Sequence, residues 1–308
     1  MCRMLGYIGT SVGLDDLLIK PDSSLIHQVV DAQMLSMLNL AGYGLAAWDD
    51  AMADPHLPLL FRSTDVAIFD PNLRSIATKL RVRALIAHLR GIPYDGHVAV
   101  NRQSLHPFSL AGSPLVLTHN GDLARFGEMR YDLVAHIRPD ILPHIAAMTD
   151  SAWLYALILS CLDGDVAGPC SLDALLAATQ RALAIVRDIR SRRGITQSSS
   201  VNLLLGDGRS LLAVRFTFDF GRFERPPFQG GVNFLSLWYT MGAAYQFADG
   251  EWKMTGGSAG ASTLVASEPA TRDVATWVEV PEYAALLVDG AADGSAASPR
   301  RRIAALDI

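Results

Sequence analysis

Few features of this sequence point to a redox, membrane or nucleic-acid function. The 308 residues include only three cysteines, Cys2, Cys161 and Cys170, whose odd number and spacing match neither a disulfide framework nor a zinc site. The 26 basic and 31 acidic residues are mixed along the chain, which excludes the basic footprint of nucleic-acid binding. No run approaches the roughly 18 apolar residues that span a bilayer. We therefore expect a cytoplasmic protein acting on a small molecule, with no nucleic-acid or membrane partner.

Half of the residues are hydrophobic, which is enough for a substantial buried core. Apolar runs bounded by turn residues predict strands up to residue 119 and again after residue 194. The expected strands cover residues 4–8, 42–48, 57–61, 83–88, 114–119, 201–205, 211–216, 234–240, 263–267 and 284–288. The expected helices cover residues 24–38, 72–80, 123–137, 151–162 and 171–189. Because regular βαβ alternation is missing, this order predicts an α+β fold of antiparallel sheets sandwiched by helices.

No linker divides the chain into separate domains, so we expect one domain over residues 1–290. Residues 291–308 contain many small residues and a run of three arginines, which predicts a disordered tail.

Cys2 is a candidate nucleophile because removal of Met1 would leave a thiol and a free α-amine on one residue. An α-amine titrates near pH 8 and a thiol at about 8.5, so the amine can accept the thiol proton. Such a nucleophile can attack amides. The short apolar strand that begins at Met4 would anchor Cys2 against a sheet.

Three further patterns suit amide chemistry, although each also has an ordinary structural explanation. Arg90 ends a predicted strand, where its planar fork matches a carboxylate or simply forms a surface ion pair. Asn120 and Gly121 end another strand and offer either two neutral donors for an oxyanion or a plain turn. Asp150 precedes an apolar helix, which it would cap unless its carboxylate holds a substrate ammonium.

Together these patterns resemble the class II glutamine amidotransferases in both composition and order. The motifs are Met1-Cys2-Arg3-Met4-Leu5-Gly6, Gly42-Tyr43-Gly44, His88-Leu89-Arg90, His106-Pro107-Phe108, His119-Asn120-Gly121 and Thr149-Asp150-Ser151. Ala266-Ser267-Glu268-Pro269, followed by Trp277 and Pro281, resembles the stand-alone branch of that family, which includes the γ-glutamyl hydrolase of ergothioneine biosynthesis.

The resemblance implies a four-layer αββα N-terminal nucleophile hydrolase fold. It implies that Cys2 is the nucleophile with its own amine as base, and that Asn120 and Gly121 form the oxyanion hole. Arg90 would bind the α-carboxylate of the substrate and Asp150 its α-amine. We also assign His119 to substrate binding, where it supports the turn that aims Asn120.

The function expected from this resemblance is hydrolysis of a γ-glutamyl amide through a Cys2 thioester, which releases glutamate and an amine. The expected reaction requires no metal or organic cofactor. His88, His106 and His119 are not expected to bind a metal, because they lack ligand partners at usual spacings. Two alternatives stay open. The chain could be a glutaminase subunit that passes ammonia to a separate synthetase, or a non-catalytic binding protein that keeps the fold.

The sequence also departs from the family pattern close to the expected substrate site. Arg90-Gly91-Ile92-Pro93 lacks the hydroxyl residue that relatives usually carry three positions after the arginine. Ser104 and Ala41 stand where relatives commonly have Asn and Asp. We therefore expect the loop from Arg90 to His106 to influence which γ-glutamyl compound is accepted.

Overall fold

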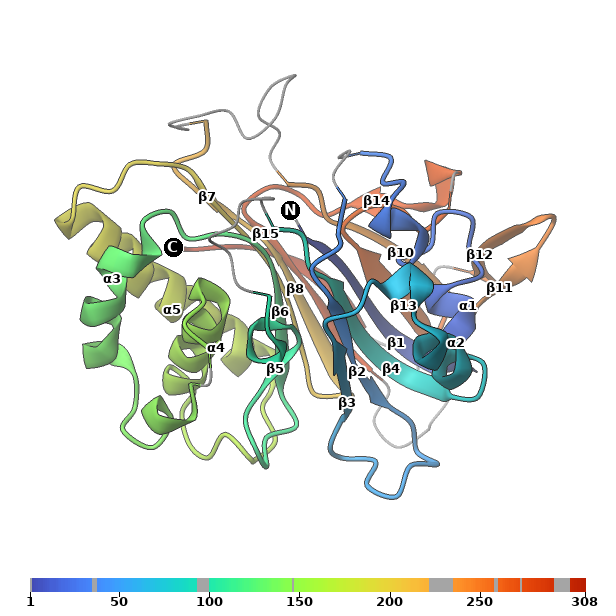
Figure 1. Cartoon of the computed structure of the whole chain (residues 1–308), viewed down its shortest axis with the longest axis horizontal. Coiled ribbons are helices and arrows are strands. Elements are labelled where there is room, and N and C mark those ends of the chain that lie inside the picture. Colours follow the sequence, from blue (N-terminus) through green and yellow to red (C-terminus); the bar gives the residue numbers. More distant parts are fainter. Residues whose placement is uncertain are drawn as a thin grey trace.

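Two antiparallel sheets face each other at the centre of the molecule, with helices on their outer sides (Figure 1). The structure, a computed structural model, describes residues 2–34, 38–92, 100–145, 147–221, 235–257, 260–271, 273–290 and 300–308. This architecture confirms the expected α+β sandwich of antiparallel sheets between helical layers.

Sheet A contains the strand that follows Cys2. Its spatial order in the described residues is β14 (Val278–Glu279), β10 (Trp238–Gly242), β13 (Ser262–Ala266), β1 (Arg3–Gly13), β4 (Arg81–Leu89), β2 (Tyr43–Trp48) and β3 (Leu59–Ser63). β1 lies at the centre of this sheet, between β13 and β4. The start of the chain is therefore fixed on both sides by strand pairing.

Sheet B contains the strand that ends in Asn120 and Gly121. Its order is β16 (Arg300–Ala305), β15 (Ala284–Asp289), β8 (Ser210–Arg215), β7 (Ser199–Gly206), β6 (Val116–Gly121) and β5 (Phe108–Ser109), and β9 (Thr217–Phe218) also pairs with β7. A separate hairpin joins β11 (Ala244–Ala248) to β12 (Glu251–Thr255).

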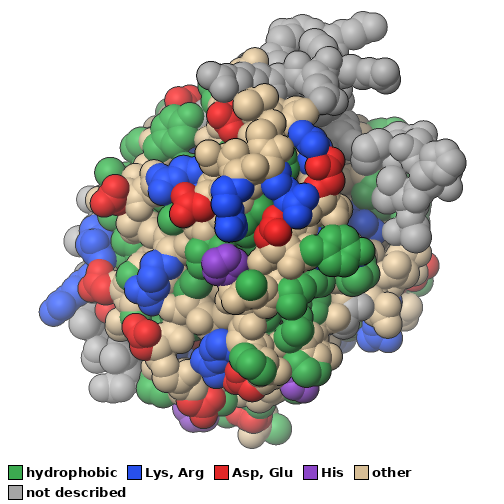
Figure 2. Space-filling model, turned by 90° about the vertical axis from the view of Figure 1, so that its left-hand side faces the viewer, with side chains coloured by type: hydrophobic (Ala, Val, Ile, Leu, Met, Phe, Trp, Pro, Cys, Tyr) green, Lys and Arg blue, Asp and Glu red, His purple; other side chains and the backbone are tan. Residues whose placement is uncertain are grey.

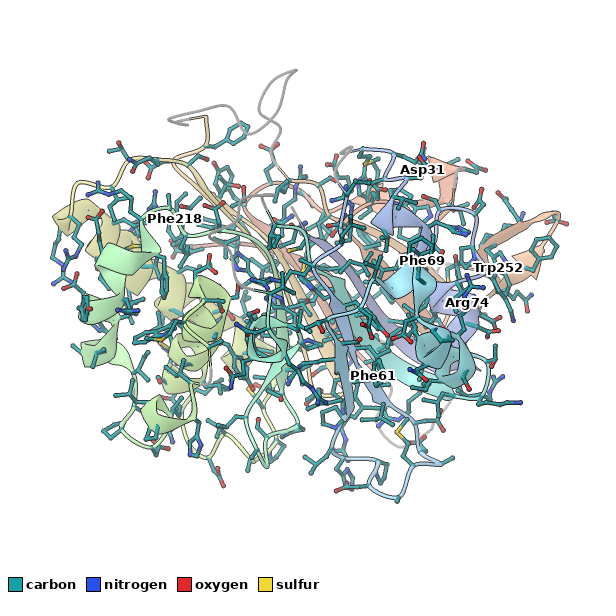
Figure 3. All side chains as sticks on the ribbon, viewed as in Figure 1. Asp31, Phe61, Phe69, Arg74, Phe218 and Trp252 are labelled. Atoms are coloured by element: carbon teal, nitrogen blue, oxygen red, sulfur yellow. The ribbon has the colours of Figure 1, made fainter. Side chains whose placement is uncertain are left out.

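The helices divide unequally between the two outer faces. Sheet B is covered by α3 (Phe126–Leu133), α4 (Asp150–Ser160) and α5 (Leu172–Arg192), and sheet A by the short α1 (Leu14–Leu18) and α2 (Pro71–Ala77). The single 3-10 turns are η1 (His27–Val29), η2 (Ala67–Phe69), η3 (Arg102–Ser104), η4 (Val134–His136), η5 (Leu142–His144) and η6 (Val274–Thr276). In Figure 3, Phe218 marks the sheet B side, and Phe69, Arg74 and Trp252 mark the sheet A side.

Alternation along the strands builds three apolar cores. Met4 and Leu204 point between the two sheets, whereas their neighbours Leu5 and Leu203 point outward toward the helices. Successive side chains of a strand face opposite sides of the sheet, so strands covered on both faces become apolar almost throughout. This explains why all eight residues of β7 are buried.

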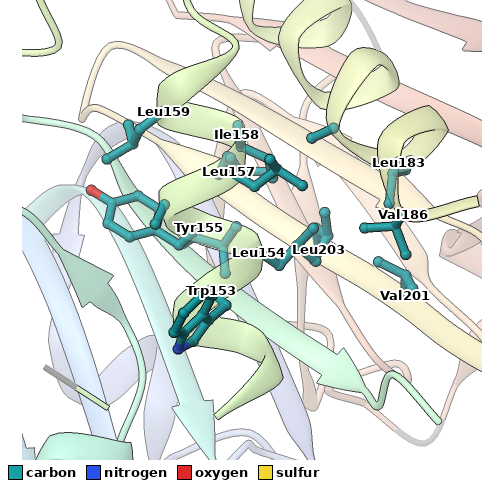
Figure 4. Close-up of a cluster of buried hydrophobic side chains, with 14 of the residues drawn as sticks. Trp153, Leu154, Tyr155, Leu157, Ile158, Leu159, Leu183, Val186, Val201 and Leu203 are labelled. Atoms are coloured by element: carbon teal, nitrogen blue, oxygen red, sulfur yellow. The ribbon is translucent and has the colours of Figure 1, made fainter. Parts of the chain in front are cut away.

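The core between sheet B and its helices depends on α4. All the residues from Ser151 to Leu159 are buried, because α4 lies between the sheet and neighbouring helices (Figure 4). A helix that is apolar all round is expected only where it is covered on all sides. α5 is instead amphipathic and buries residues such as Leu183 and Val186 against the same core. The first turn of α4, which holds Asp150, thus rests on a rigid support.

The helix expected over residues 24–38 is wrong. Residues 27–29 form only the turn η1, and the backbone N–H groups of Gln33 and Met34 donate to the Glu268 carboxylate rather than to a helix. Leu25, Ile26 and Val29 are nevertheless buried against sheet A. The apolar spacing therefore predicted the burial of these residues correctly, although they do not form a helix. Residues 35–37 lie outside the described part of the chain.

The structure also differs from the disordered tail expected over residues 291–308. Arg300–Ala305 form β16, which pairs with β15 at the edge of sheet B, and Arg301 Nε donates to Thr263 Oγ1 at 2.5 Å. Its three consecutive arginines are followed by Ile303 and two alanines, and the strand lies at the edge of sheet B, where charged side chains are common. Residues 291–299 lie outside the described residues.

The helical face carries charges of both signs. Figure 2 shows basic and acidic side chains interspersed over this surface. Some are paired in surface ion pairs, such as Arg193 with Asp132 and Arg181 with Asp163, which are screened by solvent and contribute little to stability. Within the described residues, none of the helices is both long and apolar enough to cross a membrane.

Candidate active site

Cys2 lies directly before β1, at one end of the space between the two sheets. Met4 pairs with His88, and continuing that register places Cys2 opposite Arg90, the first residue after β4. Met4 and Ile86 belong to the core between the sheets, so the period of two directs Cys2 and Arg90 to the same inner face. Cys2 is 9% exposed, and its thiol donates to the Gly91 carbonyl oxygen at 3.7 Å.

Arg90 is fixed through its backbone and its side chain. Its N–H donates to the Gly42 carbonyl at 2.9 Å, and its carbonyl accepts from Ala41 at 3.1 Å. Its Nη1 donates to Ser104 Oγ at 2.7 Å. Ser104 therefore uses its hydroxyl, at a position where the family resemblance leads one to expect an amide, to hold the Arg90 guanidinium.

The charge on Arg90 is partly compensated by the groups around it. Burial lowers the pKa of Arg90, while the neighbouring Cys2 and Asp150 oppose that shift. The two groups that oppose the shift come from different layers of the molecule, because Cys2 directly precedes β1 of sheet A and Asp150 begins α4. The structure thus brings together Cys2, Arg90 and Asp150. The first and last of these are 148 residues apart in the sequence.

Asn120 and Gly121 end β6 on sheet B. Asn120 shares the inner face with Val116, is 2% exposed, and donates from Nδ2 to Ser267 Oγ at 3.4 Å. Gly121 has φ of 153°, and a Cβ there would lie 1.8 Å from the Ser200 carbonyl oxygen. Only glycine fits this close approach between β6 and β7. The amide of Asn120 and the N–H of Gly121 are therefore held at the end of the inner face.

Asp150 is the first residue of α4, but it does not cap the helix. Thr149 is the N-cap, and its hydroxyl accepts from the Ala152 N–H at 3.3 Å. The Asp150 carboxylate accepts instead from the Leu123 N–H at 2.8 Å and from the Ser151 N–H at 2.7 Å. These contacts link α4 to the segment that follows Gly121. They aim the carboxylate at the site end of β6.

A second carboxylate, Asp122, adjoins this position. Asp122 is exposed, but desolvation by the surrounding protein and the charge of Asp150 both raise its pKa. Two acidic groups near each other favour a cationic group between or beside them. This electrostatic setting suits the α-ammonium of an amino-acid head group.

His119 points away from Asn120, toward the helical layer. Its Nδ1 lies 2.9 Å from Ser151 Oγ and its Nε2 lies 3.2 Å from the Ser200 carbonyl oxygen. Both ring nitrogens therefore contact protein groups, and through Ser151 they support the Asp150 carboxylate. This geometry agrees with support of the turn that aims Asn120. The assignment of His119 to substrate binding stays a prediction.

Two other histidines lie behind Arg90. The rings of His88 and His106 contact each other at a tilt of 38° with centroids 4.0 Å apart, and His88 Nε2 lies 3.2 Å from the His119 carbonyl oxygen. Burial lowers the pKa of His88 to about 3 and that of His106 well below its usual value. Both rings are therefore neutral packing groups at physiological pH. Within the described residues, histidine, cysteine and carboxylate side chains form no cluster of three that would hold a metal.

Sequence reasoning did not assign a role to Ser267, which contacts both halves of the site. Its hydroxyl accepts from the Met4 N–H at 3.0 Å as well as from Asn120. Ser267 belongs to the Ala266-Ser267-Glu268-Pro269 motif that the sequence singled out, but a motif does not reveal which strands its residues contact. Pro93, which the sequence singled out for substrate choice, lies outside the described residues together with the rest of 93–99.

Comparison with known proteins gives a consistent result. The family model for glutamine amidotransferases class-II matches residues 71–304. The chain is 26% identical over 306 residues to the probable glutamine amidotransferase DUG3 of Saccharomyces cerevisiae, an alignment that covers 94% of this chain and 82% of the yeast protein.

Solved structures share the fold at lower identity. A glutamine aminotransferase class-II domain protein from Silicibacter pomeroyi superimposes with a TM-score of 0.61 at 20% identity, over 99% of this chain and 100% of that chain. The glutamine phosphoribosylpyrophosphate amidotransferase of B. subtilis gives a TM-score of 0.55 at 15% identity, over 100% of this chain and 50% of that chain.

Proposed function

The chain belongs to the class II glutamine amidotransferases and is an enzyme of that type, and from this premise we propose that it hydrolyses a γ-glutamyl amide with the thiol of Cys2. The observation that carries this proposal is the meeting of Cys2, Arg90 and Asp150: the strand register places Arg90 opposite Cys2, and Asp150 lies near enough to oppose the lowering of the Arg90 pKa by burial. An amino-acid head group needs a cation for its carboxylate and an anion for its ammonium, and this arrangement provides both.

The proposed reaction begins after removal of Met1. The free α-amine of Cys2 takes the thiol proton, and the sulfur attacks the γ-carbonyl carbon of the substrate. The oxyanion that forms accepts hydrogen bonds from Asn120 Nδ2 and the Gly121 N–H. The proton held by the amine passes to the leaving nitrogen as the C–N bond breaks. Water then attacks the γ-glutamyl thioester, which releases glutamate and restores the thiol.

Arg90 and Asp150 act before the chemistry. The Arg90 fork binds the α-carboxylate and Asp150 the α-ammonium, so the γ-carbonyl is oriented toward Cys2 on binding. In the structure, the thiol is directed at the Gly91 carbonyl. We propose that binding of the head group beside Arg90 turns the thiol from Gly91 toward the substrate carbon.

The finer assignment is a stand-alone γ-glutamyl hydrolase, similar to the enzyme of ergothioneine biosynthesis. Ala266-Ser267-Glu268-Pro269 supports this branch, since Ser267 and Glu268 both contact the strand of Cys2. The alternative is a glutaminase that delivers ammonia to a separate synthetase. Such a subunit would release glutamate from glutamine faster when its synthetase is added.

The test is a panel of γ-glutamyl compounds with glutamate release as the signal. Glutamine, γ-glutamyl dipeptides and γ-glutamyl thiol conjugates are compared for wild type and Cys2→Ala. We expect release from at least one compound in wild type and none in the variant, with equal thermal stability of the two proteins. Wild-type release by Cys2→Ala removes Cys2 from the mechanism. No release from any compound by a chain that begins at Cys2 favours the non-catalytic alternative.

A further inference from the structure

Ser267 joins the nucleophile strand to the oxyanion-hole strand. It follows β13, and its own N–H donates to the Met4 carbonyl at 3.0 Å while its hydroxyl accepts from the Met4 N–H at 3.0 Å. It therefore continues the pairing of β1 with β13 by one residue, with a side-chain oxygen in place of a backbone carbonyl. The same oxygen accepts from Asn120 Nδ2 of sheet B at 3.4 Å.

Through this contact the Asn120 amide directs its nitrogen, rather than its oxygen, at Ser267. A side-chain amide carries two donor hydrogens on nitrogen and two acceptor lone pairs on oxygen. When one hydrogen of Nδ2 is directed at Ser267, the second stays on the same nitrogen and can be offered to an oxyanion. Rotation by 180° would present the amide oxygen instead, which repels an oxyanion. An oxyanion hole must have its donors oriented before the charge develops.

The backbone around Ser267 is itself held firmly. The Ser267 carbonyl accepts from Ser236 Oγ at 2.8 Å. The next residue, Glu268, accepts from the N–H groups of Gln33 and Met34 at 2.9 and 3.0 Å, and lies 3.9 Å from Arg3 Nη2. Arg3 in turn donates to the Cys2 carbonyl at 3.0 Å. Figure 3 shows Asp31, two residues before Gln33, at the upper edge of the sheet A side.

We propose that Ser267 is a positioning residue of the reaction, which holds the Asn120 amide with its nitrogen toward the oxyanion and fixes it relative to the strand of Cys2. This inference rests on the function proposed above. Ser267 is 5% exposed, and it acts through Asn120 rather than on the substrate. Its loss should therefore lower the rate of the chemical step and leave binding of the head group by Arg90 and Asp150 unchanged.

A double-mutant cycle of Ser267→Ala and Asn120→Ala tests the proposal. We expect Ser267→Ala to lower kcat about tenfold with little change in KM, as for the loss of one hydrogen bond in a catalytic site. In the Asn120→Ala background the same change should alter kcat less than about twofold, because residues acting as one unit are not additive. Alkylation of Cys2 by iodoacetamide forms no oxyanion, so its rate should stay near wild type in Ser267→Ala.

Ser113→Ala is the matched control. Ser113 is also a buried serine that accepts from a backbone N–H, here Leu115 at 3.3 Å, and it donates to the Val166 carbonyl at 2.8 Å, away from the site. It should leave kcat unchanged. If Ser267→Ala does not fold, Ser267→Cys, which keeps the volume and weakens the acceptor, takes its place in the cycle.

Three results would overturn the proposal alone. They are an equal loss of kcat on changing Ser267 in both backgrounds, a wild-type kcat for Ser267→Ala, and a loss for Ser113→Ala as large as that for Ser267→Ala. Wild-type turnover by Asn120→Ala would overturn it together with the assigned oxyanion donor. Failure of the proposed function is detected separately, by activity that survives Cys2→Ala.

Discussion

At the scale of single residues, Arg90 is the group to which we assign substrate capture in the proposed function. Its guanidinium donates to Ser104. The charges of Cys2 and Asp150 oppose the lowering of its pKa by burial. Arg90→Lys keeps the charge but loses the two parallel donors, so we expect KM to rise by roughly tenfold or more while kcat changes less. Steady-state kinetics of glutamate release measure this. An unchanged KM would show that the carboxylate binds elsewhere.

Asn120 provides a complementary prediction, because it is expected to act on the transition state. Asn120→Ala should lower kcat by about 10²–10³, equivalent to roughly 3–4 kcal/mol, with KM close to wild type. Comparison with Arg90→Lys separates the two roles, since one variant should change mainly kcat and the other mainly KM. A defect confined to KM in Asn120→Ala would mean that the oxyanion donors are misassigned.

The sequence pointed to the candidate site residues more readily than to the residues that contact them. Cys2, Arg90, Asn120 and Asp150 are recognisable because each occupies a strand or helix end within a specific motif. The contact between Arg90 and Ser104 could not be foreseen, because it depends on how the chain returns after residue 99.

At the scale of elements, strands were easier to predict than the short helical turns. The strand expected over residues 83–88 appears as β4 (Arg81–Leu89), since burial on both faces gives a continuous apolar run. The helix expected over residues 24–38 failed because the Glu268 carboxylate, 234 residues beyond Met34, takes the N–H groups that a helix would have used. A competing acceptor so far away in the sequence gives no signal in the local spacing of apolar residues.

The start of α4 gives a prediction about stability. Thr149 is the N-cap of this helix, so Thr149→Ala should lower the free energy of unfolding by about 1 kcal/mol. KM should stay near wild type, because Asp150 keeps its contacts with Leu123 and Ser151. Denaturant unfolding and steady-state kinetics measure the two effects.

Ser171→Ala is the control for this change, since Ser171 caps α5 in the same way through the Ala174 N–H, away from the site. It should cost a similar amount of stability. A large rise of KM in Thr149→Ala but not in Ser171→Ala would mean that the cap itself takes part in substrate binding.

At the scale of the whole molecule, two sheets from distant parts of the chain enclose neutral histidines next to the site. Burial lowers the pKa of His88 to about 3, whereas an unfolded histidine titrates near 6.5. Below about pH 6.5 the unfolded chain binds a proton that the folded protein does not. The contribution of such a histidine to the free energy of unfolding is therefore fully present above pH 6.5. It falls as the pH decreases, by about 1.4 kcal/mol per pH unit for each such histidine.

Thermal unfolding between pH 7.5 and pH 5 tests this expectation. His106→Phe keeps an aromatic ring against His88 and Phe108 but removes one of the titrating groups, so the slope of stability with pH should become shallower. A wild-type protein equally stable at pH 7.5 and pH 5 would contradict the buried neutral histidines. So would a slope unaffected by His106→Phe.

The most direct test of the account is the intact mass of active enzyme, quenched in acid during turnover of a γ-glutamyl substrate and then digested. We predict that the active chain begins at Cys2 and that a γ-glutamyl adduct lies on its N-terminal peptide, absent from Cys2→Ala. An active chain that retains Met1, or an adduct on any other residue, would contradict the mechanism.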